Sequence, residues 1–119
     1  MAVRSLSAGT LMGDTVKNHQ DENIGNLEEI MIDLETGRVA YVVISAGGFL
    51  GIGDKYFGIP WEMVGVDTED KSIVIDLDKE TLKDAPGFDK DNWPDSTDMD
   101  WLSEVYVYHE VEPFWGARR

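Results

Sequence analysis

The chain has 119 residues, a length typical of one domain, and carries 24 Asp and Glu against 10 Lys and Arg. The formal net charge of −14 and a pI near 4.2 predict that nucleic acids and anionic membrane surfaces repel it. The absence of cysteine excludes disulfides, thiol nucleophiles and thiolate zinc sites. Without an apolar run long enough to cross a bilayer, or a signal-peptide pattern at the N-terminus, we expect a soluble cytoplasmic protein with no membrane insertion.

Short extended segments dominate the first two-thirds of the sequence. Apolar patterning and turn residues predict strands at 11–17, 24–34, 38–45, 56–59, 64–67 and 72–77. In the second strand, Ile30, Ile32 and Leu34 alternate with Met31 and Asp33, which indicates one half-buried face. The last strand has the same alternation, in which Ile73, Ile75 and Leu77 are expected to point inward.

The spacing of these segments predicts a fold that is mainly β. Six short strands with hairpin connections and no room for crossover helices favour a small six-stranded barrel or rolled sheet, because closure removes exposed strand edges. We therefore divide the chain into an N-terminal segment (1–8), a barrel (9–78) and an acidic, aromatic C-terminal extension (79–119).

The extension is expected to contain short helices. Residues 78–85 can form one or two helical turns, and residues 97–100 resemble a capping box that begins a helix near 98–109. Trp101, Val105 and Tyr108 share one face of that helix, and we expect this face to pack on the barrel.

Residues 47–55 form a glycine-rich segment that invites comparison with phosphate-binding loops. Asp54 separates the last glycine from Lys55, so the spacing does not fit a phosphate loop and nucleotide binding is not expected. Phe49, Leu50 and Ile52 either fold back over the barrel or meet a partner. We favour the partner-binding interpretation and expect a homodimer or larger assembly with these residues at its interface.

Five aspartates in the extension suggest calcium, whose ligands are carboxylate and carbonyl oxygens. They are Asp89, Asp91, Asp95, Asp98 and Asp100. Trp93 and Pro94 occupy positions that an EF-hand loop gives to a ligand and to glycine, so solvated loop acids and a helix cap explain the pattern better. No metal site or cofactor is expected.

No set of residues predicts catalysis. His19 and His109 lie in no local metal-ligand pattern and beside no serine nucleophile motif. Candidate acid and base pairs are Asp33 with Glu35 and Glu28 with Glu29, but adjacent strand residues point to opposite faces. The tryptophans at 61, 93, 101 and 115 are expected to serve as packing anchors, with Trp93 and Trp101 holding the extension to the barrel or to another subunit.

Several of these segments together resemble the PRC-barrel family. The resemblance runs from about residue 9 to 78 and rests on residues 13–18, 25–37, 38–41, 47–55 and Pro60-Trp61. Residues 84–94 are similar to the extension of bacterial stand-alone members. The resemblance implies a six-stranded barrel like that of the photosynthetic reaction-centre H subunit and of a ribosome maturation factor, where it docks on proteins.

Neither of those specific roles transfers to this sequence, which lacks the membrane helix of the H subunit and the N-terminal domain of the ribosome factor. We therefore expect a non-catalytic protein-binding or self-associating adaptor of unknown pathway. The alternatives are a small-molecule or cation-binding module, or an accessory protein of photosynthetic electron transfer or ribosome assembly. An enzyme would require polar residues clustered in a cleft, where this sequence offers apolar residues and glycine.

Overall fold

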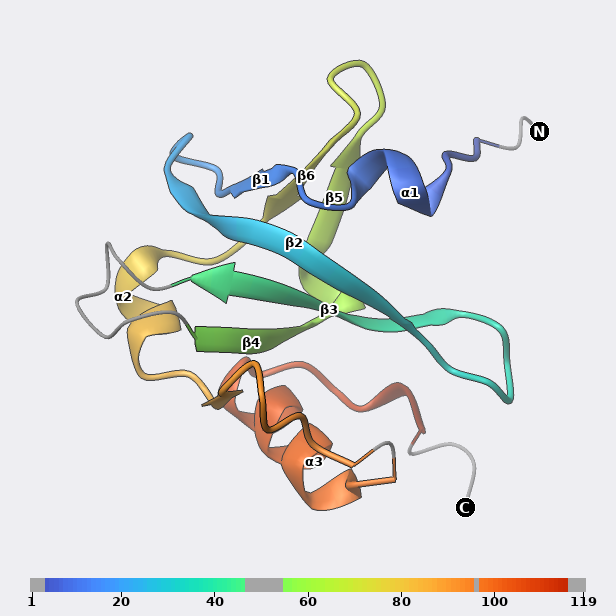
Figure 1. The fold of residues 1–119 in the computed structure, drawn as a ribbon, viewed down its shortest axis with the longest axis vertical. Coiled ribbons are helices and arrows are strands. Elements are labelled where there is room, and N and C mark those ends of the chain that lie inside the picture. The colour runs from blue at the N-terminus through green and yellow to red at the C-terminus, as the bar shows by residue number, and fades with distance from the viewer. Residues whose placement is uncertain (1–3, 47–54, 96, 116–119) are drawn as a thin grey trace.

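The computed structural model describes residues 4–46, 55–95 and 97–115 (Figure 1). Its helical elements are α1 (Ala8–Leu11), the 3-10 turn η2 (Trp61–Met63), α2 (Lys79–Lys83) and α3 (Met99–Tyr108). Its strands are β1 (Thr15–Lys17), β2 (Asn23–Ile32), β3 (Val39–Ala46), β4 (Lys55–Pro60), β5 (Val64–Asp67), β6 (Ser72–Ile75) and β7 (Gly87–Phe88).

These strands form one sheet in the order β5-β6-β1-β2-β3-β4-β7. Described neighbours pair antiparallel, except that β1 and β6 run parallel. The prediction of a mainly β fold is confirmed, but the expected six strands are seven and the described ladder does not close into a barrel. The extra strand, β7, has only two residues, too few to leave a periodic pattern in the sequence.

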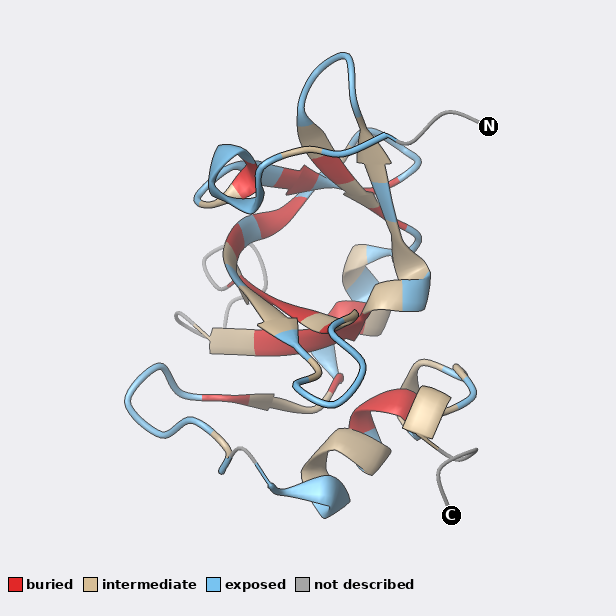
Figure 2. Cartoon of the chain, turned by 90° about the vertical axis from the view of Figure 1, so that its right-hand side faces the viewer, coloured by how far each residue is buried: buried red, intermediate tan, exposed pale blue. Residues whose placement is uncertain are grey.

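The sheet is rolled around an apolar core. Figure 2 shows the strands curving around a shared interior, toward which their buried residues gather. The inward positions of Ile73, Ile75 and Leu77 are confirmed by their burial. Much of the remaining core comes from β1 to β4, through Val16, Ile24, Leu27, Val42, Ile44, Phe57 and Ile59.

Different elements lie at the two ends of the rolled sheet. Near one end lies α2, which begins where the Asp78 carboxylate accepts a hydrogen bond from the Thr81 N–H at 2.7 Å. Its Leu82 enters the core and is fully buried. At the other end lies the N-terminal segment, where Leu11 ends α1, so that β1 begins at Thr15 and not at the expected residue 11.

The β2–β3 hairpin corrects one expectation about the core. Ile32 is 50% exposed and Leu34 is 92% exposed, so the expected half-buried face ends at Ile30. Alternation continues in the sequence beyond the end of β2, but the chain turns away from the core at Asp33. The Gly37 N–H donates to the Asp33 carbonyl at 2.8 Å, and Leu34 lies inside that turn.

Candidate functional site

The residues predicted to contact a partner, Phe49, Leu50 and Ile52, lie outside the described part of the chain. The flanking strands are well defined, because Ala46 of β3 pairs with Lys55 of β4 at the base of this connection. The role of the glycine-rich segment therefore stays a prediction.

A hollow of about 430 Å³ lies at the end of the roll opposite α2, and we call it the mouth hollow. Three parts of the chain far apart in sequence form most of it: the N-terminal segment, the β2–β3 hairpin and the β5 region. Its lining residues are Arg4, Ser5, Leu6, Ala8, Leu11, Ile30, Ile32, Val39, Trp61, Val66 and Thr68. The lining is mainly apolar, and among these residues Arg4 alone carries a charge.

Local structure explains how Trp61 and Arg4 come to this hollow. Pro60 ends β4, and the single turn η2 follows, in which the Val64 N–H donates to the Trp61 carbonyl. Elsewhere in the lining, the Arg4 guanidinium donates to the Thr68 hydroxyl at 2.9 Å. This bond ties the N-terminal segment to the turn between β5 and β6.

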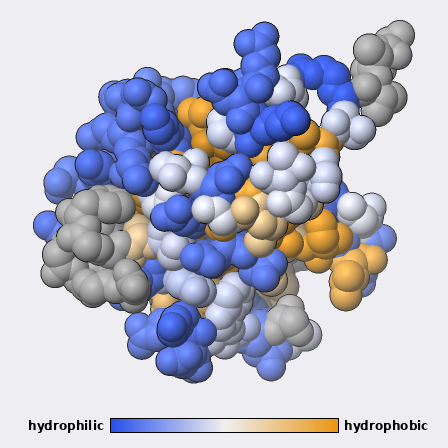
Figure 3. Space-filling view, turned by 45° about the horizontal axis from the view of Figure 1, so that its top comes forward, coloured by the Kyte–Doolittle hydropathy of each residue, from blue (hydrophilic) through white to orange (hydrophobic). Residues whose placement is uncertain are grey.

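Ile32 and Leu34 form an exposed apolar projection beside the mouth hollow, which we call the hairpin knob. Ile32 also lines the hollow, so the two features are continuous. Figure 3 shows apolar residues, in orange, at the surface on the right-hand side of the molecule, among other places. Sequence reasoning missed the knob because its alternating pattern is that of a buried strand face.

The outer face of β3 and β4 is a second apolar surface, and the C-terminal extension covers it. The Trp101 ring packs on β4 at Gly58, and its centroid lies 5.8 Å from that of Tyr41 and 5.5 Å from that of Phe88. Trp93 lies edge-on to Tyr56 at 5.7 Å. Both tryptophans therefore hold the extension to the sheet, as expected from the sequence.

Tyr106 is the largest fully buried side chain of the described residues, and no motif of the sequence points to it. Its hydroxyl donates to the Ala40 carbonyl at 2.8 Å and lies 3.3 Å from Glu62 Oε1. Burial, reinforced by the Glu62 charge, raises the pKa of Tyr106 well above its usual range. Its ring contacts Trp115 at 4.7 Å, so a second face of α3 is buried beneath the segment that follows it.

The comparison with known families agrees with this architecture. The family model described as "PRC-barrel domain" matches residues 5–82, which is more than half of the chain. The chain belongs to the PRC-barrel family. The match contains strands β1 to β6, whereas β7 and α3 lie beyond it. No protein with a curated description matches the sequence.

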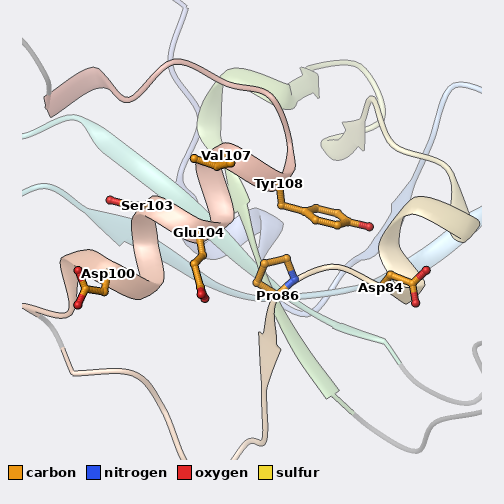
Figure 4. A pocket seen from close by; sticks show the side chains of 7 residues that line it. All are labelled: Asp84, Pro86, Asp100, Ser103, Glu104, Val107 and Tyr108. Carbon is orange, nitrogen blue, oxygen red and sulfur yellow. The ribbon is translucent and has the colours of Figure 1, made fainter.

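In this PRC-barrel protein the extension also forms an acidic groove of about 870 Å³. Figure 4 shows Asp100 and Glu104 along α3, with Asp84 at the far end of the groove beyond Pro86. The carboxylates are spread along the groove and do not converge on one point. In the described ranges, no group of three histidine, aspartate or glutamate side chains could hold a metal ion.

Two of the aspartates considered as calcium ligands organise the backbone before α3. The Asp98 carboxylate accepts from the Trp101 N–H at 3.0 Å and caps the helix. The Asp95 carboxylate accepts from the N–H and the hydroxyl of Thr97, and these bonds lower the pKa of Asp95. Asp89, Asp91 and Asp100 are exposed. The predicted helix cap is therefore present at Asp98.

His109 follows α3, and both of its ring nitrogens are buried with no hydrogen-bond partner among the described residues. Burial lowers its pKa to about 4, so the imidazole is neutral near pH 7. His109 lines a small recess of about 250 Å³, together with residues that include Asp76, Asp78 and Glu110. His19 is exposed, and its Nε2 lies 3.9 Å from Asp76.

The acidic pairs considered for catalysis are held on the β2–β3 hairpin. Asp33 shapes the turn, because its carboxylate accepts from the Thr36 hydroxyl at 2.6 Å. Glu28 is half-buried on β2, and Glu29 is exposed. Neither pair lines the mouth hollow.

Among the helices of the described segments, none is long and apolar enough to cross a membrane.

Proposed function

We propose that this PRC-barrel protein is a non-catalytic protein-binding module that docks through the hairpin knob. The observation that carries the proposal is the exposure of Ile32 and Leu34 beside an apolar hollow. Single exposed apolar residues are ordinary on protein surfaces, but apolar residues continuous with a hollow are typical of interaction sites. The knob would fill an apolar pocket on another protein.

Charge indicates the kind of partner. Leu34 lies between Asp33 and Glu35 in a chain of net charge −14. A partner that carries basic groups around an apolar pocket would match both features, because complementary charges favour encounter and orientation. This acidic setting disfavours nucleic acid as the partner.

The extension narrows the choice of docking surface. The outer face of β3 and β4 is already packed by Trp101, and the Tyr106 hydroxyl bonds to the backbone of β3. A partner could reach this face only by displacing those contacts. The hairpin knob requires no such rearrangement.

The non-catalytic part of the proposal is supported by the lining of the mouth hollow. It offers mainly aliphatic side chains, with Trp61 and Arg4, and none of its described lining residues is an acid or a histidine. General acid–base catalysis requires a titratable group at the reacting atoms. The pathway, including photosynthetic electron transfer or ribosome assembly, would follow from the identity of the partner.

The test is capture of partner proteins from native extract on three immobilised proteins. The wild type is compared with an Ile32→Ser/Leu34→Ser double variant. The control is Val107→Ser, which removes an apolar side chain of 73% exposure from α3. We expect the wild type and the control to retain the same protein, and the double variant to lose it.

The retained protein is then purified and its affinity for each variant is measured by calorimetry. A loss of at least about tenfold in affinity, confined to the double variant, supports the knob. Equal affinity of all three proteins contradicts the proposal. Circular dichroism of each variant establishes that the fold is retained.

Self-association through Phe49, Leu50 and Ile52 is a separate proposal of ours. Light scattering at several concentrations compares the wild type with a Phe49→Ser/Leu50→Ser variant. A wild-type dimer that dissociates in the variant supports it. A wild-type monomer refutes it, and a dimer that persists in the variant places the interface elsewhere.

A further inference from the structure

The mouth hollow has the size and position of a small-ligand site. Such sites usually have volumes of roughly 300 to 1,000 Å³, are lined mostly by apolar residues with a few polar groups, and often lie at the mouths of β-barrels. At about 430 Å³ the hollow falls within that range. Its walls include Ile30 and Val39 from the hairpin and Val66 from β5, with Trp61 beside them.

The polar residues of this lining, Arg4, Ser5 and Thr68, are all exposed. Arg4 supplies the charge, and Thr68 supplies a hydroxyl within hydrogen-bond distance of the guanidinium. The bond to Thr68 uses one of the several N–H donors of Arg4, and a guanidinium can bind a carboxylate through two parallel N–H groups. Arg4 is exposed, so an anion can approach it from solvent.

The positive charge of Arg4 is the second feature of the hollow that indicates the chemical class of its ligand. The chain has a net charge of −14, but the described residues that line this apolar hollow include a cation and no carboxylate. A neutral apolar molecule would use the walls alone. A cation would be repelled by Arg4, whereas an apolar molecule with one negative group would use both the walls and Arg4.

We propose that the mouth hollow binds a small amphipathic anion, with its apolar body against the walls and its carboxylate at Arg4. This site does not depend on protein docking at the hairpin knob. Bound ligand would join the N-terminal segment to the hairpin and to β5, because all three contribute to the lining. Binding would therefore stabilise the fold and raise the melting temperature.

The probe is octanoate, and 1-octanol is its uncharged counterpart of equal chain length. Isothermal calorimetry on the full chain should give saturable binding of one octanoate, and octanol should bind at least about tenfold more weakly. The same concentrations of octanoate should raise the melting temperature. Absence of saturable binding of octanoate up to millimolar concentrations overturns the proposal.

Two variants test the placement of the ligand. Arg4→Gln should weaken octanoate binding by about tenfold and leave octanol binding unchanged, whereas Lys83→Gln, on the exposed side of α2, should change neither. Ala8→Trp adds a large side chain at an exposed position of the lining, and it should weaken both ligands. Unchanged octanoate affinity in both Arg4→Gln and Ala8→Trp would place the site elsewhere and refute the proposal.

The result can be separated from that for protein docking. If the hollow serves only as a contact surface for another protein, octanoate will not bind, while the Ile32→Ser/Leu34→Ser variant will still lose its partner. If docking fails and octanoate binds, the ligand site stands alone. Each proposal can therefore fail without the other.

Discussion

Gly58 of β4 and Trp101 of α3 are in direct contact across the junction between barrel and extension. A Cβ atom at Gly58 would approach Trp101 Cη2 to 2.7 Å, which is closer than real Cβ contacts allow. Glycine at position 58 therefore leaves the space that the edge of the indole occupies against the strand. The position of the extension on the sheet thus depends on a missing side chain.

Gly58→Ala should therefore lower the free energy of unfolding by about 2 kcal/mol, because the added methyl displaces the indole. Urea unfolding measures this loss. Gly65→Ala is the matched control in β5, since its Cβ would meet the Val74 carbonyl at an ordinary 3.6 Å. In a Trp101→Ala background the cost of Gly58→Ala should shrink, and an unchanged cost would mean that the two residues are not coupled.

Trp101→Ala alone should lower the free energy of unfolding by about 3 kcal/mol, as expected for a packed aromatic side chain. The indole contacts Tyr41 and Phe88 as well as Gly58, so its removal loosens several elements. Val107→Ala is the control on the exposed side of α3. An unaltered melting temperature in Trp101→Ala would show that the extension adds nothing to the stability of the barrel.

Tyr106→Phe removes the hydroxyl that donates to the Ala40 carbonyl while keeping the ring. We expect a loss of about 1 to 2 kcal/mol, because the buried carbonyl then lacks this donor. Chemical denaturation followed by tryptophan fluorescence gives the value. The neighbouring Val107→Ala should change stability by less than about 0.5 kcal/mol. If Tyr106→Phe also lowers stability by less than about 0.5 kcal/mol, water replaces the hydroxyl without cost.

Glu110 has a φ of 58°, in the left-handed region, and follows His109, the C-cap of α3. The Val111 N–H donates back to the Tyr106 carbonyl at 3.0 Å, a pattern in which glycine is favoured at this position. Glu110→Gly should therefore raise stability by up to about 1 kcal/mol. Glu104→Gly, inside α3, should lower it by about 1 kcal/mol, and thermal melts of both variants test the opposite signs. A lower melting temperature in Glu110→Gly would contradict this account.

The pH dependence of stability should reflect His109. Its pKa is about 4 in the folded protein against an ordinary value of 6.5, so the unfolded chain binds more protons between these values. The stabilisation is complete above about pH 6.5 and is lost as the pH falls toward 4. Melting temperatures from pH 7 to 4.5 should decline less in His109→Gln than in wild type, while exposed His19→Gln should match wild type. Equal declines in all three would exclude His109 as the source.

Much of the fold could be predicted from the sequence because its signals are local. Ile73, Ile75 and Leu77 alternate on a short strand, and burying that side of the strand is the one arrangement that removes all three from water. Asp98 stands where a helix begins, and its carboxylate can satisfy an N–H of the first turn without help from distant residues. The net charge follows directly from the amino-acid composition.

Other features were decided by tertiary contacts. Ile32 and Leu34 continue the alternating pattern, but whether that face meets the core depends on where the hairpin leaves the rolled sheet, which distant strands determine. Tyr106 is buried where its hydroxyl can donate to the carbonyl of Ala40, 66 residues away, and no helical period encodes such a partner. The mouth hollow arises where the N-terminal segment, the β2–β3 hairpin and β5 converge. Sequence order therefore determines which segments are apolar, while three-dimensional packing determines which of their apolar residues remain accessible to a partner.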